Sequence, residues 1–334
     1  MLRRNWPVML LIAVLLVGLL LPLATKASPP GFYVEVLLGG LMAGVLYSLV
    51  AMGFALIFKA SGVFNFAQGA MVLFAALAVA RLSERMPLAL AILLAFAIMI
   101  VLAWLIERLV LRPLVNQEGV ALLMATLGVT YFLDGFGQTV WGSDIYSIEL
   151  GIAKEPVMIL DGVFQGGILV NKEDFVAALV AALLVTALSI FFQKTSTGRA
   201  LRAVADDHQA AQSIGIPLNR IWVIVWSIAG LVALVAGILW GAKLGVQFSV
   251  SQVALKALPV VILGGFTSVN GAIIGGLIIG VGEKMAEVFL GPVMVKMFDL
   301  AGGGIENWFA YVLALLFLLV RPEGLFGEKH IDRV

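Results

Sequence analysis

The sequence predicts an all-α polytopic membrane protein, with about ten transmembrane or re-entrant helices and short broken helices lining a central path. Hydrophobic residues make up 62% of the 334 residues, charged residues make up only 12%, and the mean hydropathy is +1.10. A soluble domain carries about a quarter charged residues. A chain this apolar cannot cover its surface with polar groups, so lipid must be the solvent for much of it.

Apolar runs of the right length define the candidate spans, because a membrane helix needs about 20 apolar residues. The runs are Pro7–Ala24, Val34–Phe58, Phe66–Ala80, Leu88–Ile106, Val120–Val140, Phe175–Phe192, Trp222–Ala242, Val253–Gly265, Asn270–Phe289 and Trp308–Val320. Phe66–Ala80 and Val253–Gly265 are short for spans. Short, glycine-interrupted segments in transporters often mark broken or re-entrant helices near the substrate path.

We predict one transmembrane domain over residues 1–334, with the first run as an added N-terminal span. Arg3 and Arg4 precede this run, and small residues follow it near Ala27, a pattern that a cleaved signal peptide shares. The run over residues 7–24 is long for a signal peptide, so we favour a retained anchor helix. If it is cleaved, nine spans remain.

The basic residues orient the helices, because they concentrate in cytoplasmic loops. With the N-terminus inside, 12 of the 21 Lys and Arg residues lie inside and 6 lie outside, which predicts that both termini are cytoplasmic. Two long loops then face opposite sides. Gly142–Asp174 lies outside and mixes acidic with apolar residues, which predicts a folded external cap. Gln193–Ile221 lies inside.

The inside loop is predicted to form two short helices. Thr197 is a candidate cap for a helix that begins near Gly198, and Asp206 and Asp207 interrupt the apolar face. Gly215, shortly before a proline, is a helix stop signal. Such a loop either docks into a groove on a cytosolic partner or lies on the lipid headgroups as an interfacial helix.

The same loop resembles a known family. Gln209-Ala210-Ala211-x-x-x-Gly215 is similar to the E-A-A-x-x-x-G coupling-helix motif of bacterial ATP-binding-cassette importer permeases, with Gln in place of Glu. The preceding stretch 197–207, TGRALRAVADD, resembles the permeases of the branched-chain amino-acid (Liv-type) uptake family.

Three further stretches carry the resemblance, which covers a family-like core over residues 34–327. They are GVFNFAQG at Gly62–Gly69, the glycine-rich segment Lys256–Gly276, and RPEGLFG at Arg321–Gly327. The family implies a multi-pass permease of the bacterial inner membrane that works with a second permease subunit, two cytoplasmic ABC ATPases and a periplasmic substrate-binding protein. The implied cargo is a small polar solute, a branched-chain or related amino acid, or else urea, an amide or another small acid.

The resemblance also assigns the coupling loop, residues 193–221, to contact with the ATPase. Its coupling residues are Arg202, Asp206, Asp207, Gln209, Ala210, Ala211 and Gly215. No G-x-x-x-x-G-K-[ST] phosphate loop occurs in the chain, so ATP hydrolysis is expected in a partner.

A short pattern occurs twice and suggests the translocation path. Gly62-x-Phe64-x4-Gly69-Ala70 matches Gly264-x-Phe266-x4-Gly271-Ala272, and both lie at the predicted inside end of a span. The candidate path residues are Asn65, Gln68, Gly69, Thr267, Ser268 and Asn270. Their uncharged polar groups suit passing hydrogen bonds with a solute. The alternative is that they cap helix ends or join helices by hydrogen bonds.

Small and charged residues cluster in the predicted run Asn270–Phe289. Gly271, Gly275, Gly276 and Gly280 form two small-xxx-small pairs, which predict close helix packing. Glu283 and Glu287 are expected near the outer end of the span, partly neutralised by Lys284 or facing a wet cavity.

Several classes of function are disfavoured by what the sequence lacks. It has no cysteine and only two histidines, which argues against a metal site, a cofactor or an intramembrane enzyme. No basic cluster suggests nucleic acid. A stand-alone secondary transporter or channel stays an alternative, although it would need coupling charges or a filter of its own.

Overall fold

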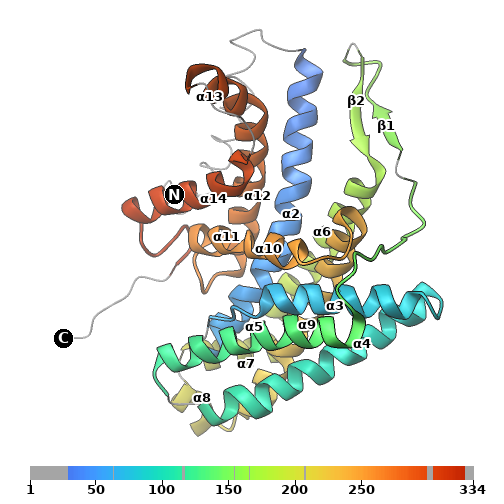
Figure 1. Ribbon diagram of the computed structural model, residues 1–334. Helices are drawn as coiled ribbons and strands as arrows, with labels where there is room; N and C mark the ends of the chain where they lie inside the picture. Colours follow the sequence, from blue (N-terminus) through green and yellow to red (C-terminus); the bar gives the residue numbers. More distant parts are fainter. Residues whose placement is uncertain are drawn as a thin grey trace. The chain divides into compact units, whose positions relative to one another are not determined.

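The computed structural model describes residues 29–62, 64–114, 117–153, 155–164, 166–206, 208–298 and 304–327, and this part of the chain is mainly helical (Figure 1). The predicted run Pro7–Ala24 lies outside the described residues. Five helical segments are long and apolar enough to cross a membrane. They are α2 (Pro30–Ser61), α4 (Leu88–Leu105, which continues through η1, Ile106–Leu111, and η2, Arg112–Leu114), α5 (Gly119–Trp141), α6 (Lys172–Lys194) and α9 (Leu218–Leu244).

The two short predicted runs, Phe66–Ala80 and Val253–Gly265, do not form single long helices. The first becomes α3 (Gln68–Ser83), and the second is divided between α10 (Ser249–Leu255) and α11 (Ala257–Gly264). The segments 249–264 and 269–290 form a bent pair that raises the number of candidate spans to six if it counts as one. Helices therefore stand at every predicted run within the described residues. The count of about ten stays a prediction.

The remaining helices are α7 (Ser196–Asp206), α8 (His208–Ser213), α12 (Val269–Met285), η3 (Ala286–Leu290), α13 (Gly291–Phe298) and α14 (Ile305–Val320). The predicted cap loop contains a two-stranded antiparallel sheet, β1 (Pro156–Ile159) and β2 (Ile168–Asn171). The carboxylate of Glu35 on α2 accepts a hydrogen bond from the backbone N–H of Leu169 at 3.1 Å, which ties β2 to α2.

The contacts divide the chain into two compact units. The described residues of unit 1 fall within 29–51, 152–183 and 256–327, and those of unit 2 fall within 52–151 and 184–255. Helices α2 and α6 contribute to both units, so neither unit is a continuous piece of sequence.

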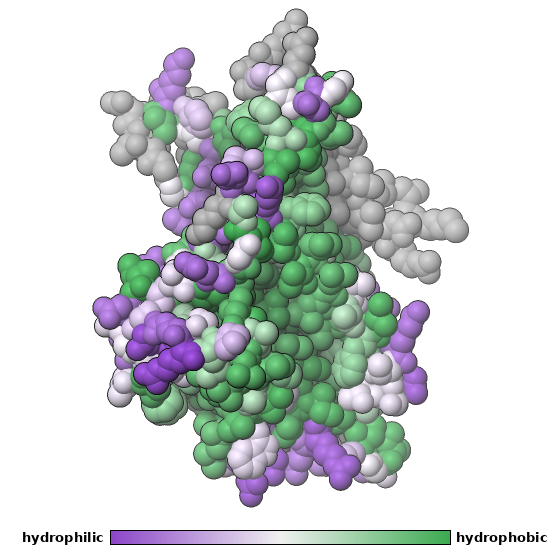
Figure 2. Space-filling view, turned by 90° about the vertical axis from the view of Figure 1, so that its right-hand side faces the viewer, coloured by the Kyte–Doolittle hydropathy of each residue, from purple (hydrophilic) through white to green (hydrophobic). Residues whose placement is uncertain are grey.

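The core of unit 2 is α3, which is buried along residues 68–80. It packs against α4, α5, α9 and α10. Small residues allow this close approach, since a Cβ added at Gly237 of α9 would lie 2.5 Å from the Val72 carbonyl oxygen on α3. Most of α4 and α5 is not buried within the chain, and their exposed side chains are largely apolar. Figure 2 shows how much of one face is hydrophobic, as expected where lipid is the solvent.

Glycines set the packing of α2 against α12 in unit 1. A Cβ added at Gly44 would lie 2.8 Å from the Gly276 carbonyl oxygen, and one added at Gly40 would lie 2.8 Å from the Val281 Cα atom. Ser48 strengthens the contact by donating its hydroxyl hydrogen bond to the Ile273 carbonyl at 3.0 Å. Gly276 and Gly280, two of the predicted packing residues, face Gly44 here.

The other two predicted packing glycines lie where α12 meets α11. Gly271 lies against the backbone of Gly264, and a Cβ added at Gly275 would lie 2.7 Å from the Val260 carbonyl oxygen. The C-terminal end of α11 also pairs with the chain's tail. Leu325 and Phe326 donate backbone hydrogen bonds to the carbonyls of Leu263 and Gly264, at 2.8 and 3.0 Å.

The glycine contact between α2 and α12 predicts a difference between two identical substitutions on one helix. Gly44→Ala should lower the free energy of unfolding by about 1–3 kcal/mol, because its methyl group meets backbone atoms of α12. Gly39→Ala meets nothing within 4 Å and should leave stability unchanged or slightly raised. Titration of the purified variants with SDS, followed by circular dichroism, measures the difference. Equal loss in both variants would contradict the packing described.

Candidate functional site

A polar turn begins α3 at the first predicted path segment. The Asn65 side chain accepts a hydrogen bond from the Ala67 N–H at 3.1 Å and donates one to the Gln68 side chain at 3.3 Å. Gln68 in turn donates to the Ala229 carbonyl of α9 at 3.3 Å. Both side chains have 0% exposure. Within unit 2 these amides therefore hold the broken start of α3 to α9.

Close contacts surround this turn. A Cβ added at Gly69 would lie 2.7 Å from the Ser251 carbonyl oxygen of α10, and one at Gly53 would lie 2.7 Å from the Gln68 Nε2 atom. Thr126 of α5 donates its hydroxyl to the Phe64 carbonyl at 3.1 Å, a contact that sequence reasoning missed. These contacts fit the alternative in which Asn65 and Gln68 join helices. Their place on a substrate path stays a prediction.

The second path segment forms the turn between α11 and α12. Ser268 caps α12, because its hydroxyl accepts a hydrogen bond from the Gly271 N–H at 3.0 Å. Thr267 is half-buried, and Asn270 is exposed. This segment belongs to unit 1, whereas Asn65 and Gln68 belong to unit 2. That the two segments flank one path stays a prediction.

The predicted coupling loop is joined to α6 by specific hydrogen bonds. Helix α7 begins at Ser196, and Thr195, not the predicted Thr197, caps it by accepting a hydrogen bond from the Gly198 N–H at 3.0 Å. The sequence did not distinguish these threonines, because both precede the same apolar pattern. The Arg202 guanidinium donates to the Phe192 and Gln193 carbonyls at the end of α6.

The loop forms two helices, as predicted, with the first ending at Asp206. Leu201 and Val204 are buried on the inner face of α7, whereas Asp206 is exposed. On α8, Ala211 is buried and Ala210 is exposed. Asp207 and the side chain of Gln209 lie outside the described residues.

Gly215 ends α8 in a left-handed conformation, with φ of +87°. Its N–H donates to the Gln212 carbonyl at 2.9 Å, and the Ile216 N–H donates to the Ala211 carbonyl at 3.0 Å. These two bonds are the Schellman arrangement that stops a helix. The preceding residue, Ile214, is 73% exposed. The end of α8 therefore presents a large apolar side chain on a fixed turn.

The charged residues of α12 and η3 meet the expectation for Glu287 but not for Glu283. Lys284 binds Glu287 at 2.7 Å, and Glu283 pairs with Lys256, at 3.1 Å. Adjacent side chains on a helix do not face each other, which is why Lys284 does not neutralise Glu283. Tyr47 of α2 also donates its hydroxyl to Glu283 Oε1 at 3.1 Å. Lys256 is the one charged residue in the apolar run 253–265, and this feature of the sequence could have identified it as a partner for Glu283.

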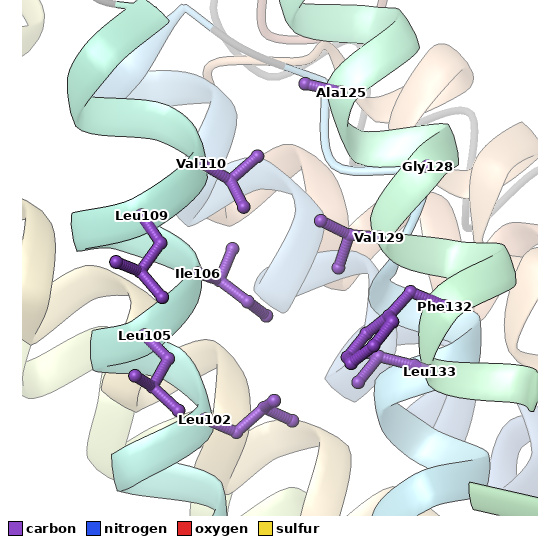
Figure 3. Close-up of a pocket in the computed structure, with 10 residues that line it drawn as sticks. All are labelled: Leu102, Leu105, Ile106, Leu109, Val110, Ala125, Gly128, Val129, Phe132 and Leu133. Atoms are coloured by element: carbon purple, nitrogen blue, oxygen red, sulfur yellow. The ribbon is translucent and has the colours of Figure 1, made fainter. Parts of the chain in front are cut away.

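An apolar pocket opens in unit 2 between α4–η1 and α5, with a volume of about 440 Å³ (Figure 3). Its ten lining residues lie between Leu102 and Val110 and between Ala125 and Leu133. Side chains from the two helices point toward each other, and none of them carries a polar atom. Because it offers no hydrogen-bonding partner, this pocket suits a hydrocarbon chain and not a polar solute.

The buried amide pair predicts a loss of stability on Gln68→Leu. The substitution leaves the Asn65 amide and the Ala229 carbonyl without the partners that they have here, which should cost about 1–3 kcal/mol. Gln138→Leu, at an exposed position of α5, should change stability by less than about 0.5 kcal/mol. Thermal unfolding of both purified variants compares them. Equal stability would show that the Gln68 bonds do not join the helices.

Comparisons with known proteins identify the family of the chain. The family model described as the branched-chain amino acid transport system permease component matches residues 36–321. The high-affinity branched-chain amino acid transport system permease protein LivH of Escherichia coli is 28% identical over 328 residues, which cover 91% of this chain and 98% of that protein.

Relatives from other organisms align over similar lengths. BraD of Pseudomonas aeruginosa, of the same description, is 27% identical, over 90% of this chain and 98% of that protein. A probable branched-chain amino acid transport permease of Methanocaldococcus jannaschii is 29% identical, over 87% of this chain and 92% of that protein. The apolar helices and the match over most of the chain lead to one conclusion: the protein belongs to the branched-chain amino acid transport permease family and is a multi-pass permease subunit of an ABC importer.

Proposed function

We propose that this permease subunit carries branched-chain amino acids across the bacterial inner membrane. The observation that carries the proposal is the similarity to LivH and BraD, which extends over about nine-tenths of this chain and nearly the whole of each relative. The complete importer would contain a second permease subunit, two cytoplasmic ABC ATPases and a periplasmic substrate-binding protein. Both termini would face the cytoplasm.

The α7–α8 pair would receive the movement of the ATPase. Arg202 and Thr195 tie α7 to the end of α6, so a displacement of the pair would move a membrane helix along with it. The exposed Ile214 and the fixed turn at Gly215 give the pair an apolar contact point for a groove on the partner. Asp206, Asp207, Gln209 and Ala210 would complete this contact surface, whereas Ala211, which is buried, would support α8 from beneath.

The solute would pass the two polar turns that begin α3 and α12. Asn65, Gln68 and Gly69 on one turn, and Thr267, Ser268 and Asn270 on the other, would offer hydrogen bonds without charge. The hydrogen bonds that Asn65 and Gln68 make within unit 2 would then have to exchange during transport.

Uptake measurements test the substrate and the energy source together. Cells that lack this gene should lose uptake of labelled leucine, isoleucine and valine but keep uptake of urea, and the wild-type uptake should stop when ATP is depleted. Restoring the gene should restore uptake. Normal amino-acid uptake without the gene, or uptake that persists without ATP, would refute the proposal.

The turn at the end of α8 predicts a selective loss of coupling. Gly215→Val should abolish most leucine uptake while the protein still inserts, because a β-branched residue is strained at φ of +87°. Gly215→Asn should keep most uptake, since Asn tolerates this conformation. Uptake, membrane content and co-purification of the ATPase are compared. Uptake that is equal in the two variants would remove Gly215 from the coupling contact.

A further inference from the structure

Three side chains form a polar cluster inside unit 1. Glu283 of α12 is 5% exposed, and its Oε1 atom accepts hydrogen bonds from the Tyr47 hydroxyl and the Lys256 ammonium, each at 3.1 Å. Tyr47 lies on α2, and Lys256 lies directly before α11. Side chains from α2, from the residue before α11 and from α12 therefore meet at one carboxylate.

Stability alone does not account for this cluster. A buried ion pair loses about as much free energy in desolvation as it gains in attraction, and an apolar pair of similar volume is often as stable. Inside a membrane protein such charges are costly and usually functional. The glycine contacts of α2 with α12 already hold these helices together.

The cluster also lacks one hydrogen-bond donor. Glu283 Oε2 is buried and has no partner in the described part of the chain, whereas Oε1 has two. A buried acceptor without a partner costs about 1–3 kcal/mol, more when it is charged. Lys256 has unused donors, because an ammonium carries three N–H groups and its one hydrogen bond among the described residues is to Glu283.

The surroundings favour a ligand that carries both charges. The Lys256 side chain is 15% exposed, so the cluster reaches the surface of the chain. Glu306, in the first turn of α14, adds a further carboxylate to the same unit. Lys256 and Glu283 lie on the two segments of the bent helix pair, 249–264 and 269–290. Bent or broken helices hold substrates in many transporters.

We propose that Glu283 and Lys256 form a binding site for the zwitterionic head of an α-amino acid. The substrate's ammonium donates to Glu283 Oε2, and its carboxylate accepts from the free protons of Lys256. Tyr47 holds the Glu283 carboxylate in place through Oε1. The inference rests on the proposed amino-acid cargo and adds the residues of the permease that recognise it. The site lies toward the outer end of α12 on the orientation proposed above.

Direct binding to the purified permease–ATPase complex, without the binding protein, tests the site. The probes are labelled leucine, the keto acid 4-methyl-2-oxopentanoate, which lacks the ammonium, and isoamylamine, which lacks the carboxylate. The wild-type complex should bind leucine at least about 10-fold more tightly than either analogue, as expected for losing one charged hydrogen bond. Equal binding of all three, or no leucine binding, would overturn the proposal.

A matched pair of variants locates the recognition. Glu283→Gln keeps the shape of the side chain and should weaken leucine binding to about the level of the keto acid. Glu287→Gln alters the exposed Lys284–Glu287 pair one turn away and should leave leucine binding within about 2-fold. Leucine binding that is unchanged in Glu283→Gln, or equally weakened in both variants, would overturn the proposal.

A double variant separates recognition from structure. Lys256→Met with Glu283→Leu removes both charges without leaving one unpaired, so the complex should assemble and hydrolyse ATP but bind no leucine. Leucine binding in this variant would show that the pair is structural. If wild-type cells show ATP-dependent leucine uptake while the double variant still binds leucine, only this inference fails. If wild-type cells take up no branched-chain amino acid, the proposed function fails and the inference fails with it.

Discussion

Hydrogen bonding of the backbone in lipid is the constraint on which the rest of the structure depends. A continuous helix satisfies its own N–H and C=O groups, but a break leaves some of them in need of other partners. Three breaks in the described part of the chain are satisfied in different ways. The Asn65 side chain closes the start of α3, Ser268 closes the start of α12, and the tail residues Leu325 and Phe326 close the end of α11. Polar residues at the breaks are thus required by the fold before any transport is considered.

This requirement explains why the sequence located the spans better than the roles of the polar residues. Hydropathy predicted every described run as a helix, because a long apolar stretch has few other stable conformations in lipid. It also indicated the breaks, through glycine and short length. It did not distinguish an amide that faces a solute from one that faces a carbonyl. Gln68 has the uncharged polar side chain expected of a path residue, yet that side chain donates a hydrogen bond to a backbone carbonyl of α9.

Long-range pairing was the second limit. The sequence suggested that Lys284 partly neutralises both Glu283 and Glu287. This is confirmed for Glu287 but not for Glu283, because a helix directs adjacent side chains apart. The actual partner, Lys256, comes from another element, and Tyr47 comes from a third. Thr195 and Thr197 show the same limit locally, since two equivalent residues precede α7 and only three-dimensional geometry selects the first. Sequence patterns predict which segments form helices. The side-chain contacts between those helices can be known only from how the helices pack.

The backbone hydrogen bonds from Leu325 and Phe326 to α11 can form only late in synthesis of the chain. Phe326 follows its partner Gly264 by 62 residues. At ribosomal rates of about 5–20 residues per second, it is synthesised roughly 3–12 s later. During that interval the end carbonyls of α11 must be satisfied by water or by other groups. The turn to α12 therefore reaches its final form only when the last part of the family-like core has been translated, so this joint is among the last parts of the nascent protein to mature.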